Sequence, residues 1–294
     1  MKILFLKGPG GIHHKNEYAL SQYKNIQFYK INRVEDLDQL DLSQYDCVYS
    51  PSTPINASKY PGIKFIFGPH FSVFPDEHQM AIIKAPNAIY IQPSEWAAQV
   101  WRNSPYCAGI PIKPVSYAVD IDRFREVRPI QERNQVFVYY KSRNPVEIQF
   151  VLNILQKHGI GGKVFQYGKY TETEYLSYLQ YSKCGIWVGR HESQGFAVEE
   201  ALSMNVPLLV WDVKSMNQEY GFNYADIPAT VIPYWDDRCG EVFYEGSEFE
   251  SKLELFLSKL ETYRPRDYIV EQLSPEACEK QLIKTIKEIG SGDQ

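Results

Sequence analysis

Residues 187–212 read WVGRHESQGFAVEEALSMNVPLLVWD, and this stretch decides the fold. An apolar run ends at 188, a polar loop spans 189–194, and a helix-like stretch begins near Gly195. Asn205 suits the left-handed position after a helix end, and Pro207 prevents the helix from continuing into the next apolar run. The order strand, loop, helix, strand is typical of a parallel sheet with crossover helices.

The same alternation extends over the whole chain. The polar, proline-containing segment 124–134 lies between two apolar runs and predicts a boundary between an N-terminal domain, residues 1–125, and a C-terminal domain, residues 126–294. The docking partner of the terminal helix is open, and a return to the first domain is one option. We expect further strands at 3–6, 47–49, 65–67, 89–91, 114–119, 136–140 and 163–167, and helices at 147–157, 248–260 and 275–289.

Composition and charge exclude several classes of protein. Of 294 residues, 44% are hydrophobic and 23% charged, which excludes a wholly disordered chain. The net charge of −5 argues against a general nucleic-acid binder. Five scattered cysteines without a C-x-x-C pair argue against a disulfide framework and a thiolate zinc site, and favour a reducing, cytosol-like compartment.

Hydropathy predicts neither a membrane span nor a signal peptide. The longest apolar runs are about six residues, whereas a transmembrane helix needs about 20. The start MKILFLKG has four apolar residues between lysines, too few for the core of a signal peptide, and predicts a buried first strand. We therefore expect a cytoplasmic protein, and attachment to the periphery of a membrane is left open.

Two glutamates lie around the start of the helix at Gly195. Glu192 is in the loop and Glu200 is in the helix, with seven residues between them. Ligands of open α/β sheets bind at the carboxyl ends of strands, and a helix N-terminus with a glycine can receive a phosphate. The alternative is that both are ordinary acidic residues that the helix dipole favours. Glu199 points about 100° away from Glu200 around the helix, and we expect it on a solvated face.

This segment resembles the signature of retaining glycosyltransferases with the two-domain B-type fold (GT-B), family 4 in particular. That signature has two glutamates seven residues apart, then alanine, a small residue and a proline before an apolar strand. The resemblance covers most of residues 115–290, and residues 1–114 only in outline. It implies two Rossmann-like domains that face each other across a cleft, with the acceptor on the first and the nucleotide-sugar on the second. It further implies that Glu192 bonds a hydroxyl of the donor sugar and that Glu200 takes the ribose hydroxyls, and a carboxylate suits both tasks.

The N-terminal half contributes three further matches. Residues 117–124 (YAVDIDRF) are similar to the family segment G-V-D-x-x-x-F, with Ala118 in place of the glycine. The loop 8–11 (GPGG) follows the first strand, so the resemblance implies that Gly10 and Gly11 approach the donor phosphates; a tight turn is the alternative. His70 stands where the family has a histidine that faces the transferred sugar, and a loop histidine satisfied by its surroundings is the alternative.

The leaving nucleoside diphosphate needs cationic donors to stabilise its developing charge. The family places an arginine and a lysine after the first strand of the second domain, and here KSRN follows that strand, which indicates Lys141 and Arg143. The usual glycine-arginine pair is absent, and the family lysine would fall near Glu147. Arg190 is a further candidate for binding the diphosphate. The resemblance also implies that Gly195 and Phe196, at the helix start, contact the nucleotide-sugar.

We therefore expect a metal-independent enzyme without a cofactor that transfers a sugar from a UDP-, GDP- or ADP-sugar to a carbohydrate or other hydroxyl acceptor, with retention of configuration. One alternative is a metal-dependent A-type glycosyltransferase, whose D-x-D mark occurs at 36–38 and 120–122. Another is a non-catalytic carbohydrate- or nucleotide-binding protein of the same fold. Nicotinamide dinucleotide binding is disfavoured because the G-x-G at 8–10 runs on to His13 instead of a glycine.

Overall fold

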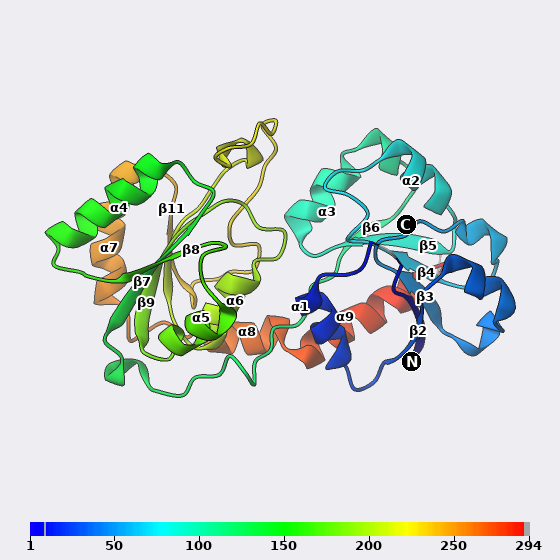
Figure 1. Cartoon of the computed structure of the whole chain (residues 1–294), viewed down its shortest axis with the longest axis horizontal. Coiled ribbons are helices and arrows are strands. Elements are labelled where there is room, and N and C mark those ends of the chain that lie inside the picture. The colour runs from blue at the N-terminus through cyan, green and yellow to red at the C-terminus, as the bar shows by residue number, and fades with distance from the viewer. Residues whose placement is uncertain (9, 291–294) are drawn as a thin grey trace. The chain divides into compact units, whose positions relative to one another are not determined.

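The computed structural model describes residues 1–8 and 10–290, which form two compact units (Figure 1). Unit 1 comprises Met1–Ala118 together with the C-terminal segment that starts at Pro275, and unit 2 comprises Val119–Ser274. Each unit has one parallel β-sheet and its own apolar core. The expected fold class, two Rossmann-like α/β domains, is confirmed.

Unit 1 has a six-stranded parallel sheet in the order β2-β1-β3-β4-β5-β6. Strands β1, β3, β4 and β5 are almost entirely buried, because helices cover both faces of a parallel sheet. The strands are β1 Lys2–Leu6, β2 Gln27–Ile31, β3 Cys47–Ser50, β4 Phe65–Phe67, β5 Ala88–Gln92 and β6 Ile112–Pro114. The helices are α1 His14–Ser21, α2 Glu77–Ile83, α3 Glu95–Arg102 and α9 Pro275–Glu288, with short 3₁₀ helices at Val34–Gln39, Leu42–Gln44, Ala57–Lys59 and Pro105–Cys107.

Unit 2 has a five-stranded parallel sheet in the order β11-β10-β9-β7-β8. Because β7 and β9 are neighbours, the loops that leave their carboxyl ends lie side by side, which is where α/β sheets bind ligands. The strands are β7 Gln135–Lys141, β8 Lys163–Gln166, β9 Ser182–Gly189, β10 Leu208–Trp211 and β11 Gly240–Phe243. The helices are α4 Pro145–Lys157, α5 Glu172–Leu179, α6 Phe196–Ser203, α7 Phe249–Ser258 and α8 Pro265–Leu273, with 3₁₀ helices at Ile130–Glu132, Met216–Gln218 and Gly246–Glu248.

The terminal helix α9 docks on unit 1. Its Gln281 side chain accepts a hydrogen bond from the Ser116 backbone N–H at 3.1 Å. Glu279 accepts from the backbone N–H of Asn25 at 2.5 Å and from its Nδ2 at 2.9 Å. At the other end of α9, the Lys64 ammonium donates to the Ile286 carbonyl at 2.9 Å, where a cation also complements the helix dipole. The return of the terminal helix to the first domain is therefore the option that the structure adopts.

The predicted strand at 114–119 differs from the structure, because β6 ends at Pro114. The following residues are buried for another reason: the Ser116 hydroxyl contacts Cys278 and Gln281 of α9, and the Val119 N–H donates to the Leu273 carbonyl. An apolar run can therefore be covered by helices without pairing in a sheet. Two strands that we did not predict, β2 and β11, are short segments at the sheet edges.

The segment 124–134, expected as a linker, packs on unit 2. Ile130 lies in the core of that unit, and the buried Arg133 guanidinium donates to the carbonyls of Arg128 and Met204. The chain passes from unit 1 to unit 2 between Ala118 and Val119, and it returns to unit 1 at Pro275. Hydrogen bonds of buried polar side chains such as Arg133 attach segment 124–134 to unit 2. Composition alone does not reveal such bonds, so it did not locate the change of unit at Ala118–Val119.

None of the helices within residues 1–8 and 10–290 combines the length and the apolar character that crossing a lipid bilayer requires.

We predict that Glu279→Ala weakens the docking of α9 and lowers the free energy of unfolding by about 1–3 kcal/mol, because two Asn25 donors in a partly buried place lose their acceptor. Urea denaturation followed by circular dichroism measures this. Glu276→Ala is the matched control on the same helix: that side chain is exposed and lies 3.9 Å from Lys24, so its loss should change stability by less than about 0.5 kcal/mol. Equal effects of the two variants would contradict the role of Glu279.

Candidate functional site

Lys141 and Glu192 meet at the carboxyl ends of β7 and β9. The parallel register places Lys141 opposite Gly189, and the Arg190 N–H donates to the Lys141 carbonyl at 2.9 Å. The Lys141 ammonium donates to Glu192 Oε1 at 2.6 Å, and it lies 4.1 Å from the centre of the Tyr167 ring. The two charged side chains are only 8% and 15% exposed. The fold thus brings two predicted site residues into one largely desolvated ion pair.

Glu200 and Glu192 both act electrostatically on the aromatic residue Tyr170. Burial raises the pKa of Tyr170 to about 12, and the charges of Glu200 and Glu192 both add to this rise. The Tyr170 hydroxyl donates to the Tyr139 hydroxyl at 3.0 Å. Glu200 itself is buried within α6. Tyr170 is therefore one group on which the charges of both glutamates of the signature act.

Gly195 sets the geometry between the two glutamates. It caps α6 in the left-handed region, with φ of 96°, where a side chain would be strained. A Cβ atom at Gly195 would lie 3.5 Å from Glu192 Cβ, an ordinary van der Waals contact, so the backbone angle is what favours glycine here. The helix then begins at Phe196, and its end has the predicted left-handed Asn205, with φ of 58°. The predicted helix start and helix stop are both confirmed.

Glu199 differs from our expectation that it is a solvated residue. It is 1% exposed, and its Oε2 accepts a hydrogen bond from Gln194 Nε2 at 3.2 Å. Residues 198–203 of α6 are all buried. The reason is that α8 packs against α6 and covers a face that would otherwise be exposed to solvent. The prediction was wrong because one amphipathic pattern does not reveal a second covering helix.

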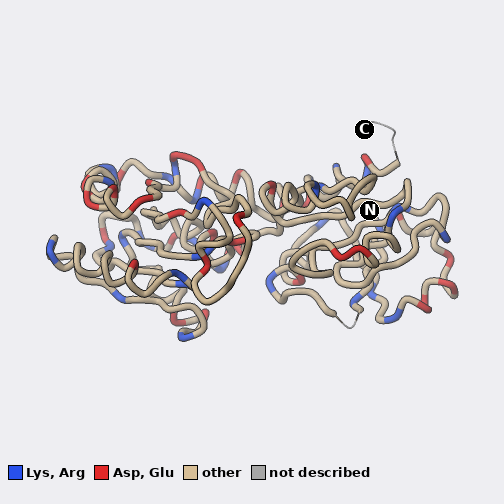
Figure 2. The backbone as a smooth tube through the Cα atoms, turned by 90° about the horizontal axis from the view of Figure 1, so that it is seen from above, with Lys and Arg blue, Asp and Glu red and all other residues tan. Residues whose placement is uncertain are grey.

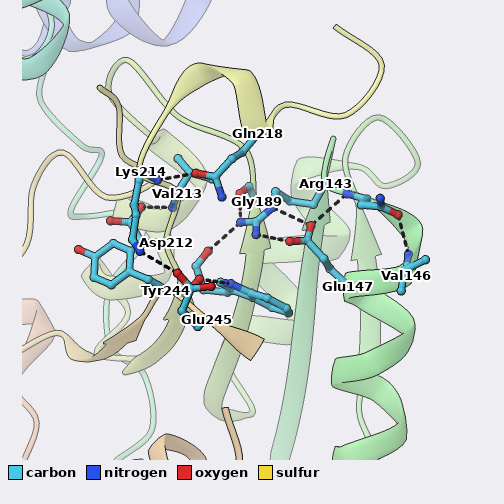
Figure 3. A network of polar contacts seen from close by, with 12 residues as sticks. Arg143, Val146, Glu147, Gly189, Asp212, Val213, Lys214, Gln218, Tyr244 and Glu245 are labelled. Carbon is cyan, nitrogen blue, oxygen red and sulfur yellow. Dashed lines mark hydrogen bonds and ion pairs between the residues drawn. The ribbon is translucent and has the colours of Figure 1, made fainter. Parts of the chain in front are cut away.

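Arg143 is fully engaged inside unit 2 (Figure 3). Its Nε and Nη2 donate to the Glu147 carboxylate at 2.9 and 2.6 Å. Its Nη1 donates to the carbonyls of Gly189 and Trp211 at 3.2 and 3.1 Å. Glu147, which stands near the expected place of the family lysine, also completes the capping box of α4 with Asn144. Arg143 thus joins α4 to the ends of β9 and β10, and its binding of phosphate stays a prediction.

Arg190 and His191 contact the buried Glu219. Arg190 Nε lies 3.2 Å from Glu219 Oε1, and His191 Nε2 lies 3.5 Å from Oε2. Burial raises the pKa of Glu219, while the charges of Arg190 and Lys141 oppose this rise. Burial and the same two cations lower the pKa of His191 to about 4. Sequence reasoning missed His191, although its position between Arg190 and Glu192 in the loop was a signal.

Asp212 holds together the two ends of a long segment between β10 and β11, residues 212–239, which we call the excursion. Its carboxylate accepts from the backbone N–H of Val213 at 2.8 Å (Figure 3). It also accepts from the backbone N–H of Val231 at 2.7 Å and from the Thr230 hydroxyl. The excursion in turn supports both site loops: the Glu192 N–H donates to the Thr230 carbonyl, and the Tyr220 N–H donates to the Ser142 carbonyl. The role of Asp212 was not visible in the sequence, because its partners are supplied by the far end of the excursion.

The predicted residues of the first half, Gly10, Gly11 and His70, all belong to unit 1. A Cβ atom at Gly10 would lie 2.9 Å from Ser52 Cβ, and Gly11 has φ of 65° with its N–H donating to the Gly8 carbonyl. The tight turn that was the alternative is therefore present, and the approach of this loop to a phosphate stays a prediction. Pro9 of the same loop lies outside the described residues.

The two D-x-D matches have structural contacts of their own. The exposed Asp38 accepts from the Tyr60 hydroxyl at 2.8 Å, and Asp120 accepts from the Arg123 N–H at 3.0 Å. Across residues 1–8 and 10–290, no three side chains of His, Cys, Asp or Glu gather in a way that could hold a metal ion. Lys and Arg are interspersed with Asp and Glu along both units (Figure 2).

Solved structures of GT-B glycosyltransferases share the fold of the chain over nearly its full length. The apo form of the lipopolysaccharide outer core galactosyltransferase WaaB matches with a TM-score of 0.59 at 14% identity, covering 98% of this chain and 99% of that one. HepE of Anabaena, in complex with UDP, matches with 0.58 at 10% identity, covering 98% and 100%. Sucrose-phosphate synthase of Thermosynechococcus elongatus matches with 0.54 at 10% identity, covering 98% of each chain.

No protein-family model and no curated protein matches the sequence. At 10 to 14% identity, the likeness to solved structures establishes the fold, and that fold is the B-type fold of glycosyltransferases.

We predict that Arg143→Ala destabilises unit 2 by about 2–4 kcal/mol, because it leaves Glu147 and two buried carbonyls without their donor. Arg143→Lys should recover only part of this loss, since an ammonium cannot donate in the three directions that the guanidinium fork serves. Urea denaturation measures both variants. Lys157→Ala breaks the exposed pair with Glu250 and is the control, with an expected change below about 1 kcal/mol. An Arg143→Ala protein as stable as this control would refute the structural role.

Proposed function

We propose that the protein transfers a glycosyl group from a nucleoside diphosphate sugar to a hydroxyl of an acceptor, with retention of the anomeric configuration. The observation that carries the proposal is the Lys141–Glu192 pair, formed in the loop before α6, together with the buried Glu200 within that helix. A cation suits the diphosphate, and two carboxylates suit the hydroxyls of sugar and ribose. Support also comes from the shared fold, since WaaB is a galactosyltransferase and the HepE structure contains UDP.

Each group has one task in this proposal. Glu200 binds the ribose hydroxyls and Glu192 orients the sugar. The N–H groups at the start of α6, from Gly195 and Phe196 onward, receive the diphosphate with the helix dipole. Lys141 stabilises the negative charge that develops on the leaving diphosphate. The bond from the anomeric carbon to the phosphate oxygen breaks, a bond to the acceptor oxygen forms on the same face, and the acceptor proton passes to the leaving phosphate.

The Lys141–Glu192 pair also links recognition of the phosphate to recognition of the sugar. Glu192 accepts from the Lys141 ammonium at 2.6 Å, so in this proposal it competes with a phosphate oxygen for the same cation. A diphosphate that binds Lys141 therefore displaces the Glu192 carboxylate, which then accepts from a hydroxyl of the sugar. Because both side chains are largely desolvated, the exchange must satisfy each of them: Lys141 keeps an anionic partner, and the displaced Glu192 accepts from the sugar hydroxyl in place of the ammonium.

The other predicted residues have supporting tasks. Arg190 adds positive charge near the diphosphate, although Glu219 neutralises part of it. Gly10, Gly11 and His70 keep the donor-binding tasks that the family resemblance implies for them. The acceptor, a carbohydrate or another hydroxyl compound, binds unit 1.

Transfer needs no metal ion, so a chelator should leave the rate of transfer unchanged, in contrast to an A-type enzyme. UDP-sugars are the first donors to test.

We predict that Glu200→Gln lowers the affinity for UDP roughly 10- to 100-fold, because it weakens charge-assisted hydrogen bonds to the ribose. Glu192→Gln should lower turnover roughly 10²- to 10³-fold with a smaller loss of UDP affinity. Calorimetry with UDP and UDP release from a panel of UDP-sugars measure the two effects. Glu254→Gln, an exposed glutamate of α7, is the control. Transfer at the wild-type rate by both site variants would refute the assignment, and UDP binding without any sugar transfer would favour a binding protein of the same fold.

We predict that Lys141→Ala lowers the affinity for UDP more than the affinity for uridine, because Lys141 reads the diphosphate. The expected loss for UDP is roughly tenfold or more, the usual weight of a charge-assisted contact. Lys169→Ala is the control, since this lysine is exposed in the loop after β8. Arg143→Ala, compared in the same way, decides whether the buried guanidinium also reads phosphate. Equal losses for UDP and uridine would show that the residue concerned does not.

A further inference from the structure

A chain of buried polar side chains lies behind His70 in unit 1. The hydroxyls of Tyr49 and Tyr117 are 2.5 Å apart, and the Asn16 side chain hydrogen-bonds to Tyr117. Asn16 Nδ2 lies 3.0 Å from His70 Nε2. The participants come from β3, from the segment after β6, from α1 and from the loop after β4. Asn16 and both tyrosines are buried, so this connection from core to loop is built into the fold.

The direction of the Asn16–His70 hydrogen bond determines which ring nitrogen carries the proton. An amide nitrogen only donates, so His70 Nε2 must accept with its lone pair. The hydrogen of the neutral ring then resides on Nδ1. A protonated ring would set an N–H of His70 against an N–H of Asn16. Burial raises the pKa of Tyr117, so its hydroxyl stays protonated and supplies no charge to the chain.

The surroundings of His70 also favour the neutral ring. Burial, and then the charge of the neighbouring His13, lower the pKa of His70 to about 4. Besides His13, the titratable groups that reach the ring through Asn16 are Tyr117 and Tyr49, and burial raises the pKa of Tyr49 as well. His70 is partly exposed, and among residues 1–8 and 10–290 its Nδ1 has no hydrogen-bond partner. The Nδ1–H group is thus available to a ligand.

We propose that Asn16 is the positioning residue of His70: it fixes the imidazole as the neutral Nδ1–H tautomer and so makes His70 a hydrogen-bond donor to a substrate oxygen. His70 then serves neither as a base nor as a cation. The tautomer stands on the geometry of unit 1 alone, whereas its use in sugar transfer rests on the proposed function.

The tautomer is measured directly on the full chain labelled with ¹⁵N-histidine, in long-range ¹H–¹⁵N spectra without ligand. His70→Gln assigns the His70 signals among the six histidines. Wild type should show the neutral Nδ1–H pattern of His70 from pH 7.5 down to about 5, across the range in which a free imidazole becomes protonated. An Nε2–H pattern, or a His70 that titrates near 6.5, would overturn the proposal without any variant.

Asn16→Asp reverses the hydrogen bond, because a carboxylate accepts from Nε2–H and stabilises the cation. We expect the His70 midpoint to rise above about 6.5 and the tautomer to change. Asn153→Asp, which adds the same charge at an exposed position of α4, should leave His70 unchanged. An unchanged His70 in Asn16→Asp would contradict the proposal.

Protein stability follows with a definite sign. In wild type the pKa of His70 is about 6.5 in the unfolded chain and about 4 in the folded protein. Below about pH 6.5 the unfolded chain therefore binds a proton that the folded protein does not bind. The contribution of the neutral His70 to the free energy of unfolding is complete above about pH 6.5 and is lost as the pH falls toward 4. In Asn16→Asp this loss between pH 7.5 and 5 should be smaller.

If transfer is observed, Asn16→Asp should lower kcat/KM roughly tenfold at a pH above the raised His70 midpoint, where the neutral ring carries its hydrogen on Nε2 and Nδ1 no longer donates. The same substitution should have little effect in the His70→Ala background. An equal loss in both backgrounds would show that Asn16 does not act through His70. A protein that transfers no sugar but keeps the Nδ1–H pattern would separate failure of the proposed function from failure of this inference.

Discussion

The parallel pairing of β7 with β9 is the constraint on which the candidate site of unit 2 depends. It sets Lys141 opposite Gly189, so that the loops after the two strands leave the sheet together. Glu192 then reaches the Lys141 ammonium, although 51 residues separate them in the chain. The excursion after β10, closed at its base by Asp212, supports both loops through backbone hydrogen bonds. Shifting this register would separate the charges that define the site.

The two cations that follow β7 have different surroundings because Ser142 lies between them with a positive φ of 47°. The backbone turns at that residue, so the two side chains do not follow the alternation of a strand. Arg143 enters the protein, where Glu147 and two carbonyls satisfy its donors. Lys141 keeps one carboxylate and one aromatic ring as neighbours. The positive charge of Arg143 thus stabilises the fold, whereas that of Lys141 is suited to binding a ligand.

Most of the fold could be predicted because apolar runs and turn residues act locally. The left-handed Asn205, the start of α6 after Gly195 and the strands β1, β3, β4 and β5 all follow from short patterns. The errors at residues 115–119 and at Glu199 share one cause, which is burial by elements distant in the chain. Residues 115–119 are buried where α9 and the end of α8 contact them, and Glu199 is buried because α8 packs on α6. A pattern read along one segment does not contain the segment that covers it.

By itself, the sequence determined the order strand, loop, helix and strand in residues 187–212. It also determined the position of Glu192 before α6 and that of Glu200 within it, because seven residues of loop and helix fix their separation. Only the tertiary structure decided which cation meets Glu192, and that Glu147 stabilises Arg143. It also decided that Asn16 contacts His70, 54 residues away. The reason is physical: strand register, and the need of each buried polar group for a partner, select these contacts among segments that local propensity leaves independent.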